Sequence, residues 1–154
     1  MTVEALWQAF VDKYPVYKDR SYEAWAFGGS RKQKDHLADL VLRGVKTATT
    51  SAYPLYDLEG ERISDVGCLD IILDGSGQAI CIIETRRVYL CRFDRVQAHH
   101  AYLEGEGDRS LAYWQAVHQD FFTDEMAAQG LEFSRDSLMV CEEFVCLYPK
   151  PIKS

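Results

Sequence analysis

The sequence has no long apolar run and no excess of basic residues, and each absence excludes a class of protein. Its strongest apolar stretches, such as residues 71–73 and 79–83, are far shorter than the roughly 20 residues that a membrane-spanning helix needs. The 17 Lys and Arg are outnumbered by 24 Asp and Glu, which gives a net charge of −7. Proteins that coat nucleic acid or anionic membranes need a basic face. We therefore expect no membrane partner and no binding to duplex DNA.

Several chemical signatures are missing as well. The sequence has no GxGxxG, Walker or GxSxG element, which disfavours dinucleotide enzymes, P-loop NTPases and α/β-hydrolases. Its five cysteines form no CxxC pair, and no His/Cys spacing suggests zinc, so no metal site and no cofactor are predicted. The cysteines are interpreted as buried reduced thiols, and acidic residues interrupt the apolar pattern of the N-terminus. Both features predict a cytoplasmic protein without a signal peptide.

What is present is an ordinary globular composition. The chain has 154 residues, of which 47% are hydrophobic and 27% charged, enough for one packed domain. We find no internal repeat, low-complexity tract or long linker. The prediction is a single domain over residues 1–154, with residues 1–24 as an N-terminal helical extension.

Apolar residues at three- and four-residue spacing predict three helices. The first follows Thr2 as N-cap and ends at Pro15, and the second begins after Ser30 and ends at Gly44. A third is expected over residues 110–122. Its apolar face is predicted to comprise Tyr113, Trp114, Val117 and Phe121.

The middle and the end of the chain favour strands. Residues 68–73 and 79–84 flank a Gly-rich turn and predict a hairpin, a further strand is expected at 87–93, and residues 137–148 predict a closing strand. Helices followed by a β-meander, a helix and a strand indicate the α+β class. Closing these strands into a small barrel would remove exposed edges.

One candidate site is residues 44–51, GVKTATTS, in which Lys46 lies beside four hydroxyl side chains. A Thr-rich edge strand explains this composition without any chemistry. Alternatively, Lys46 lies in a cleft, where partial desolvation lowers the pKa of a lysine and allows it to act as a base toward a nearby hydroxyl.

The second candidate is the segment 99–110, HHAYLEGEGDRS, which reads as a flexible acidic loop before a helix. A solvated turn with an N-cap would explain it. Alternatively, one of its carboxylates lies near Lys46 as a proton carrier, or Glu104 and Glu106 bind a hard cation. His36 and His118 are expected near the surface of helices.

These segments, in their order and spacing, resemble the ASCH-domain family. The resemblance rests on three motifs: Gly44-x-Lys46-Thr-Ala-Thr49-Thr-Ser51, Phe27-Gly28, and His100-Ala-x-x-Glu104-Gly-Glu-Gly-Asp108-x-Ser110-Leu-x-Tyr113-Trp114. It extends from about Trp25 to the C-terminus, and the chain is more similar to the longer members. The resemblance implies a PUA-like fold, a small mixed or antiparallel β-barrel flanked by helices.

The resemblance also implies an activity. Some members are amidohydrolases that remove the acyl group from N4-acylated cytidine, and others are ribonucleases. The working residues of the amidohydrolases correspond to Lys46, Thr49 and Glu104 here. The short amidohydrolases carry an arginine where this chain has Ser51, so Arg109 or the pair at 86–87 is a candidate replacement.

Strand geometry constrains this assignment. Side chains alternate along a strand, so positions 46 and 49 point to opposite faces of a regular strand. We therefore expect irregular backbone between Lys46 and Thr50. In a straight, fully paired strand Thr47 becomes a rival hydroxyl.

Three hypotheses for function follow. The first is a nucleoside amidohydrolase, whose uncharged substrate tolerates an acidic protein. The second is an RNA-binding protein or a ribonuclease acting on single-stranded RNA, with a divalent cation as its cofactor, in which Arg86, Arg87, Arg92 and Arg95 form a basic strip rather than an ordinary solvated face. The third is a regulatory domain that senses a modified nucleotide.

The predicted substrate contacts are Trp25, Phe27, Thr47, Ser51, Arg109 and Ser110, with core packing as the alternative for the two aromatic residues.

Overall fold

The computed structural model describes residues 1–151 and divides the chain into two compact units. The first unit comprises residues 1–47, 66–86 and the chain from 144 onward, and the second comprises residues 48–65 and 87–143. None of the helices in the described part of the chain has the length and apolar character needed to cross a bilayer.

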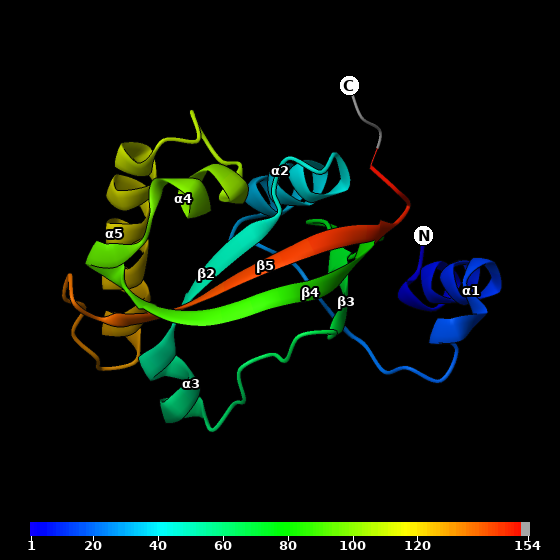
Figure 1. Cartoon of the computed structure of the whole chain (residues 1–154), viewed down its shortest axis with the longest axis horizontal. Coiled ribbons are helices and arrows are strands. Elements are labelled where there is room, and N and C mark those ends of the chain that lie inside the picture. Colours follow the sequence, from blue (N-terminus) through cyan, green and yellow to red (C-terminus); the bar gives the residue numbers. More distant parts are fainter. Residues whose placement is uncertain (152–154) are drawn as a thin grey trace. The chain divides into compact units, whose positions relative to one another are not determined.

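Residues 1–151 contain five α-helices and five strands (Figure 1). In order they are α1 (Val3–Lys13), β1 (Glu23–Trp25), α2 (Arg31–Leu42), β2 (Ala48–Ala52), α3 (Tyr53–Glu59), β3 (Leu69–Leu73), β4 (Ala79–Arg92), α4 (Ala98–Glu104), α5 (Leu111–Ala128) and β5 (Leu138–Tyr148). Short 3₁₀ turns lie at Pro15–Tyr17 and Phe93–Arg95.

The strands form one mixed sheet with the hydrogen-bonded order β1-β3-β4-β5-β2. β1 is parallel to β3, whereas β3 with β4 and β2 with β5 are antiparallel. The long strands β4 and β5 each contribute residues to both units. The expected α+β class is confirmed.

The first unit has an apolar core in two clusters. α1 covers one of them with Leu6 and Phe10, both buried with Ile71 of β3 and Ile82 of β4. α2 packs into the other, which contains Leu37, Leu40, Val41, Ile72, Ile83, Phe27 and Phe144.

The helix boundaries of the first unit follow from local chemistry. The Thr2 side chain accepts a hydrogen bond from the Ala5 amide, and the Ser30 side chain does the same for Gln33, so both helices begin where the sequence predicts. Gly44 after α2 has φ 74°, the left-handed conformation expected after a helix end.

The second unit has one apolar cluster under α5. Trp114, Phe122 and Met126 of α5 are buried against Phe93 and Met139. The predicted apolar face is wrong except for Trp114, since Tyr113, Val117 and Phe121 are exposed. The reason is that α5 carries aromatic residues on opposite sides. The spacing of apolar residues along the sequence therefore does not determine which side packs against the core.

Two segments of the second unit differ from the prediction. Residues 98–104 form helix α4 instead of a loop, and the loop begins only at Gly105, whose φ of 75° ends that helix. α3, which follows β2 directly, was not predicted at all.

Candidate active site

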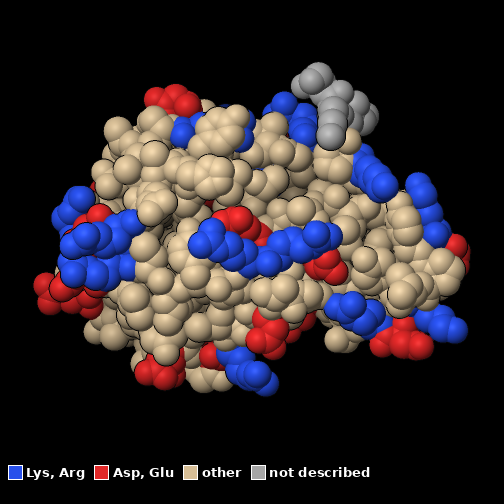
Figure 2. All heavy atoms as spheres, viewed as in Figure 1, with Lys and Arg blue, Asp and Glu red and all other residues tan. Residues whose placement is uncertain are grey.

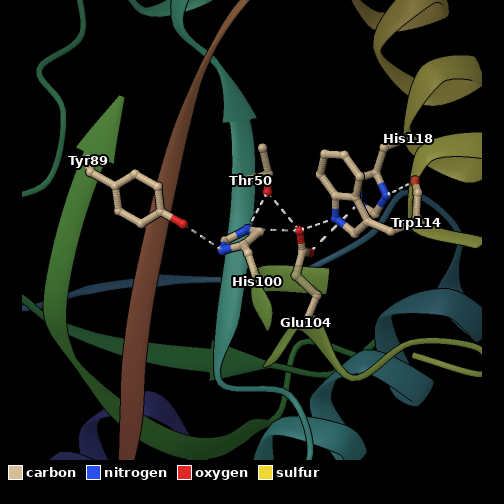
Figure 3. Close-up of polar contacts among 6 residues, drawn as sticks. All are labelled: Thr50, Tyr89, His100, Glu104, Trp114 and His118. Atoms are coloured by element: carbon tan, nitrogen blue, oxygen red, sulfur yellow. Dashed lines mark hydrogen bonds and ion pairs between the residues drawn. The ribbon is translucent and has the colours of Figure 1, made fainter. Parts of the chain in front are cut away.

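A group of buried, hydrogen-bonded polar side chains in the second unit connects β2 to α4 (Figure 3). Burial alternates along β2, so Thr50 points to the buried side while its neighbours Thr49 and Ser51 are only half-buried. His100 and Glu104 are four residues apart on α4 and therefore share one face of that helix. The Thr50 hydroxyl lies 2.7 Å from His100 Nε2 and donates a 2.7 Å hydrogen bond to Glu104 Oε2.

α5 contributes two more side chains to this group. Trp114 Nε1 donates a 2.6 Å hydrogen bond to Glu104 Oε2, and His118 Nε2 lies 3.7 Å from Glu104 Oε1. Trp114 and His118 are also four residues apart, and their rings stack at 4.5 Å. The Ser110 hydroxyl accepts a hydrogen bond from the Tyr113 amide, which starts the helix that presents both residues.

The donors and acceptors of this network fit one consistent arrangement. Because Thr50 uses its only hydroxyl hydrogen on Glu104, His100 Nε2 acts as the donor to Thr50. In the neutral imidazole the other nitrogen, Nδ1, then accepts from the Tyr89 hydroxyl, at a long 3.4 Å. Burial raises the pKa of Tyr89 above its ordinary value, which keeps the phenol protonated as that donor.

His118 is held by its other ring nitrogen. Its Nδ1 lies 2.9 Å from the carbonyl oxygen of Trp114, which can only accept, so Nδ1 carries a hydrogen. Burial by itself lowers the pKa of His118, but the hydrogen bond and the charge of Glu104, together with the Trp114 carbonyl, outweigh it and raise that pKa.

Glu104 and Thr50 have the proximity that general base catalysis requires. A buried carboxylate that accepts a hydrogen bond from a hydroxyl can remove its proton as the oxygen attacks an electrophile. Only 2% of Glu104 is exposed, and burial of a carboxylate costs several kcal/mol unless hydrogen bonds compensate it. Thr50 and Trp114 provide such bonds.

Of the predicted catalytic residues, Glu104 belongs to this group, whereas Lys46 lies in the first unit. Lys46 is almost fully buried, with its Nζ 5.1 Å from the centre of the Phe27 ring. Phe27 is part of an apolar cluster and packs edge-on against Trp25, whose Nε1 donates to Asp70. Both aromatic residues therefore pack within the first unit, and their role as substrate contacts stays a prediction.

The expected irregular backbone between Lys46 and Thr50 is wrong for its second half. β2 begins at Ala48 and pairs residue for residue with β5, from Ala48 opposite Glu143 to Ala52 opposite Met139. Regular pairing is the reason that Thr50 and not Thr49 contacts Glu104. Thr47 lies just before the strand, and its carbonyl accepts from the Phe144 amide.

The remaining predicted contacts have structural partners. The Ser51 hydroxyl lies 2.7 Å from the Tyr56 hydroxyl, and Ser110 is the N-cap of α5. Arg109 has a left-handed backbone, with φ 65°, and its guanidinium stacks 3.7 Å from the centre of the Tyr102 ring. Its Nε donates to the Tyr102 carbonyl.

Sequence reasoning missed five members of the group: Thr50, Tyr89, His100, Trp114 and His118. Three of them, Thr50, His100 and Trp114, stand in the motifs that carry the family resemblance. The motifs therefore marked these positions but did not indicate what the side chains do. His118 was expected near the surface, but only 12% of its side chain is exposed. Its position four residues after Trp114 was the only signal that could have found it.

Comparisons with known proteins agree with this architecture. A family model described as the ASCH domain matches residues 23–148. The chain belongs to the ASCH-domain family. A crystal structure of an ASCH domain from Lactobacillus crispatus JV V101 superposes with a TM-score of 0.87 at 35% identity and covers 93% of this chain and 92% of that one. The PUA-like fold that the family resemblance implied is thereby confirmed.

Two further structures resemble the ASCH-domain chain. Protein EF3133 from Enterococcus faecalis V583 is 37% identical, with a TM-score of 0.85 over 94% of this chain and 87% of that one. The hypothetical protein PH0355 is 15% identical, with a TM-score of 0.53 over 82% of this chain and 98% of that one, and shares the fold alone. No curated protein sequence matches the chain.

Proposed function

We infer that this ASCH-domain protein is an amidohydrolase that removes the acyl group from N4-acylated cytidine-type nucleosides. The observation that carries the proposal is the 2.7 Å hydrogen bond from the Thr50 hydroxyl to the buried carboxylate of Glu104, with His100 on the same hydroxyl. A hydroxyl, a carboxylate and a histidine within contact of one another are the parts that acyl transfer requires.

The proposed reaction has two stages. Glu104 takes the hydroxyl proton as the Thr50 oxygen attacks the acyl carbonyl carbon, and the protonated Glu104 then gives that proton to the cytosine nitrogen as the C–N bond breaks. In the second stage Glu104 takes a proton from the water that attacks the ester carbon, and it returns this proton to the Thr50 oxygen as the ester C–O bond breaks, which releases the acid and restores the Thr50 hydroxyl. The family resemblance adds Lys46 as a further catalytic group and Thr49 as the alternative hydroxyl.

Charge distribution favours a nucleoside over an RNA strand. Three of the four arginines of the predicted basic strip are paired with carboxylates: Arg86 with Glu84, Arg87 with Glu143 and Arg92 with Asp94. On the face in Figure 2, basic and acidic side chains are interspersed. A strip neutralised in this way attracts a phosphate backbone weakly.

The test is incubation with N4-acetylcytidine and, separately, with single-stranded RNA. We expect release of cytidine and an intact RNA strand. Glu104→Gln, which keeps the size of the side chain, should lower kcat by about 10²–10⁴-fold. Full activity of Glu104→Gln, or cleavage of RNA without release of cytidine, would overturn the proposal.

The hydroxyl is identified by two neighbouring variants. Thr50→Val should abolish turnover, whereas Thr49→Val, its matched control on the other side of β2, should keep most of it. The reverse result would assign the nucleophile to Thr49, as the resemblance predicts. Lys46→Met tests separately whether the lysine takes part, and unchanged turnover would remove it from the mechanism.

A further inference from the structure

Three side chains that can bind a metal ion lie together at the end of α4, on the side of Glu104 that faces α5. Glu104, Glu106 and His118 each place one potential ligand atom so that all three atoms lie within 4.8 Å of one another. Ligands around a divalent transition metal lie about 3–3.5 Å apart, given metal–ligand bonds of about 2.1 Å. A small inward movement of the three side chains would therefore close them around an ion.

The three groups are also held in the way that metal ligands are usually held. Ligand histidines commonly donate their second ring nitrogen to a carbonyl or carboxylate, and ligand carboxylates are themselves hydrogen-bonded. Trp114 serves both here, because its carbonyl accepts from His118 Nδ1 while its indole Nε1 donates to Glu104 Oε2. His118 Nε2 and Glu104 Oε1 are thereby turned toward each other.

Glu106 reaches the group through an unusual stretch of backbone. The two glycines that flank it both have positive φ, 75° at Gly105 and 59° at Gly107. A side chain at position 107 would collide with the Tyr113 ring at 2.4 Å, so the loop packs directly on the first turn of α5. This close packing brings Glu106 within reach of His118, one helical turn further along α5.

We propose that Glu104, Glu106 and His118 bind one divalent transition cation of the Mn²⁺ or Zn²⁺ type. Two carboxylates and one imidazole suit such ions, and three protein ligands leave further coordination positions for water. This inference does not rest on the proposed amidohydrolase, because it concerns affinity for a cation and not turnover.

The probe is Mn²⁺, because the five cysteines of the chain would compete for Zn²⁺. Chelator-treated protein is titrated with MnCl₂ at pH 7.5, and free Mn²⁺ is counted by electron paramagnetic resonance. We expect one Mn²⁺ bound per chain. Absence of binding at millimolar Mn²⁺ would overturn the proposal.

Variants locate the ion. Glu106→Gln and His118→Gln should each weaken Mn²⁺ binding at least about tenfold. Trp114→Phe, which removes the indole donor to Glu104 and part of the ring that stacks on His118, should weaken it by about 10–100-fold. Asp108→Asn is the matched control, an acid of the same loop outside the cluster, and should leave binding unchanged. Circular dichroism establishes that each variant is folded. Equal affinity in Glu106→Gln, His118→Gln and the unaltered protein would place the ion elsewhere and overturn the assignment.

Discussion

The two units bury different kinds of side chain in their cores. The first unit buries aliphatic and aromatic side chains in two clusters, with Lys46 over Phe27 as its buried cation. The second has one apolar cluster, and beside it the polar network around Glu104. Apolar packing is the cheaper way to fill an interior, because each buried polar group must find partners to offset its lost hydration. The network is therefore best explained by chemistry rather than by stability.

The largest expected effect tests the first core. Phe10 is fully buried among the rings of Trp7, Tyr14, Tyr17 and Tyr148. Phe10→Ala should lower the free energy of unfolding by about 3–5 kcal/mol, because it removes apolar contact and leaves a cavity. Urea unfolding measures this. A loss below about 1 kcal/mol would contradict the role given to this cluster.

The second core should respond differently to a smaller change. Thr50→Val keeps the volume but removes the donor to Glu104 and the partner of His100. We expect a loss of about 1–3 kcal/mol, against about 0.5 kcal/mol or less for Thr49→Val, whose side chain is half-buried. The same unfolding assay compares them, and equal losses would contradict the contrast between the two sides of β2.

The edge of the network should be weaker than its centre. The hydrogen bond from Tyr89 to His100 is 3.4 Å long, beyond the usual range. Tyr89→Phe should therefore lower the free energy of unfolding by only about 0.5–1 kcal/mol. A loss as large as that of Thr50→Val would extend the tightly bonded part of the network to β4.

The smallest expected effect is a gain in stability instead of a loss, and it concerns a carboxyl group of the first unit. Burial raises the pKa of Asp70, the hydrogen bond from Trp25 lowers it, and the charge of Glu23 raises it, with a net rise. The folded protein thus holds this proton more tightly than the unfolded chain. The resulting stabilisation is present below the unfolded pKa and is lost as the pH rises through the folded one.

Asp70→Asn cannot ionise and keeps an oxygen for the Trp25 donor, so we expect a slightly higher Tm than the parent at pH 7. The difference should disappear near pH 3, where both groups are neutral. Thermal unfolding at the two pH values measures it. A Tm below that of the parent at pH 7 would show that Asp70 contributes stability when ionised.

The sequence predicted most of the fold because its boundaries are chemically marked. Thr2 and Ser30 cap helices in the structure as expected, and the hairpin of β3 and β4 lies at the predicted turn. α4 was missed because Gln97, its N-cap residue, makes no side-chain capping bond. A seven-residue helix without a capping side chain depends on tertiary contacts for its stability, and the spacing of residues in the sequence does not reveal those contacts.

The site was predicted less well than the fold, for a geometric reason. Adjacent threonines at 49 and 50 are equivalent in composition, and only the register of β2 against β5 decides which one faces α4. Likewise, α5 has aromatic residues on opposite sides, so its buried face depends on what packs against it. Glu104 was found because the family resemblance supplied information that propensity lacks.

Trp114 gives the site an optical property. Its indole ring lies parallel to the imidazole of His118, with centres 4.5 Å apart, while Trp7 and Trp25 belong to the first unit. A protein in which those two residues are replaced by Phe would emit from Trp114 alone, since the chain has three tryptophans. A paramagnetic ion held by His118 would quench that emission, so occupancy could be followed by fluorescence in solution without any attached dye.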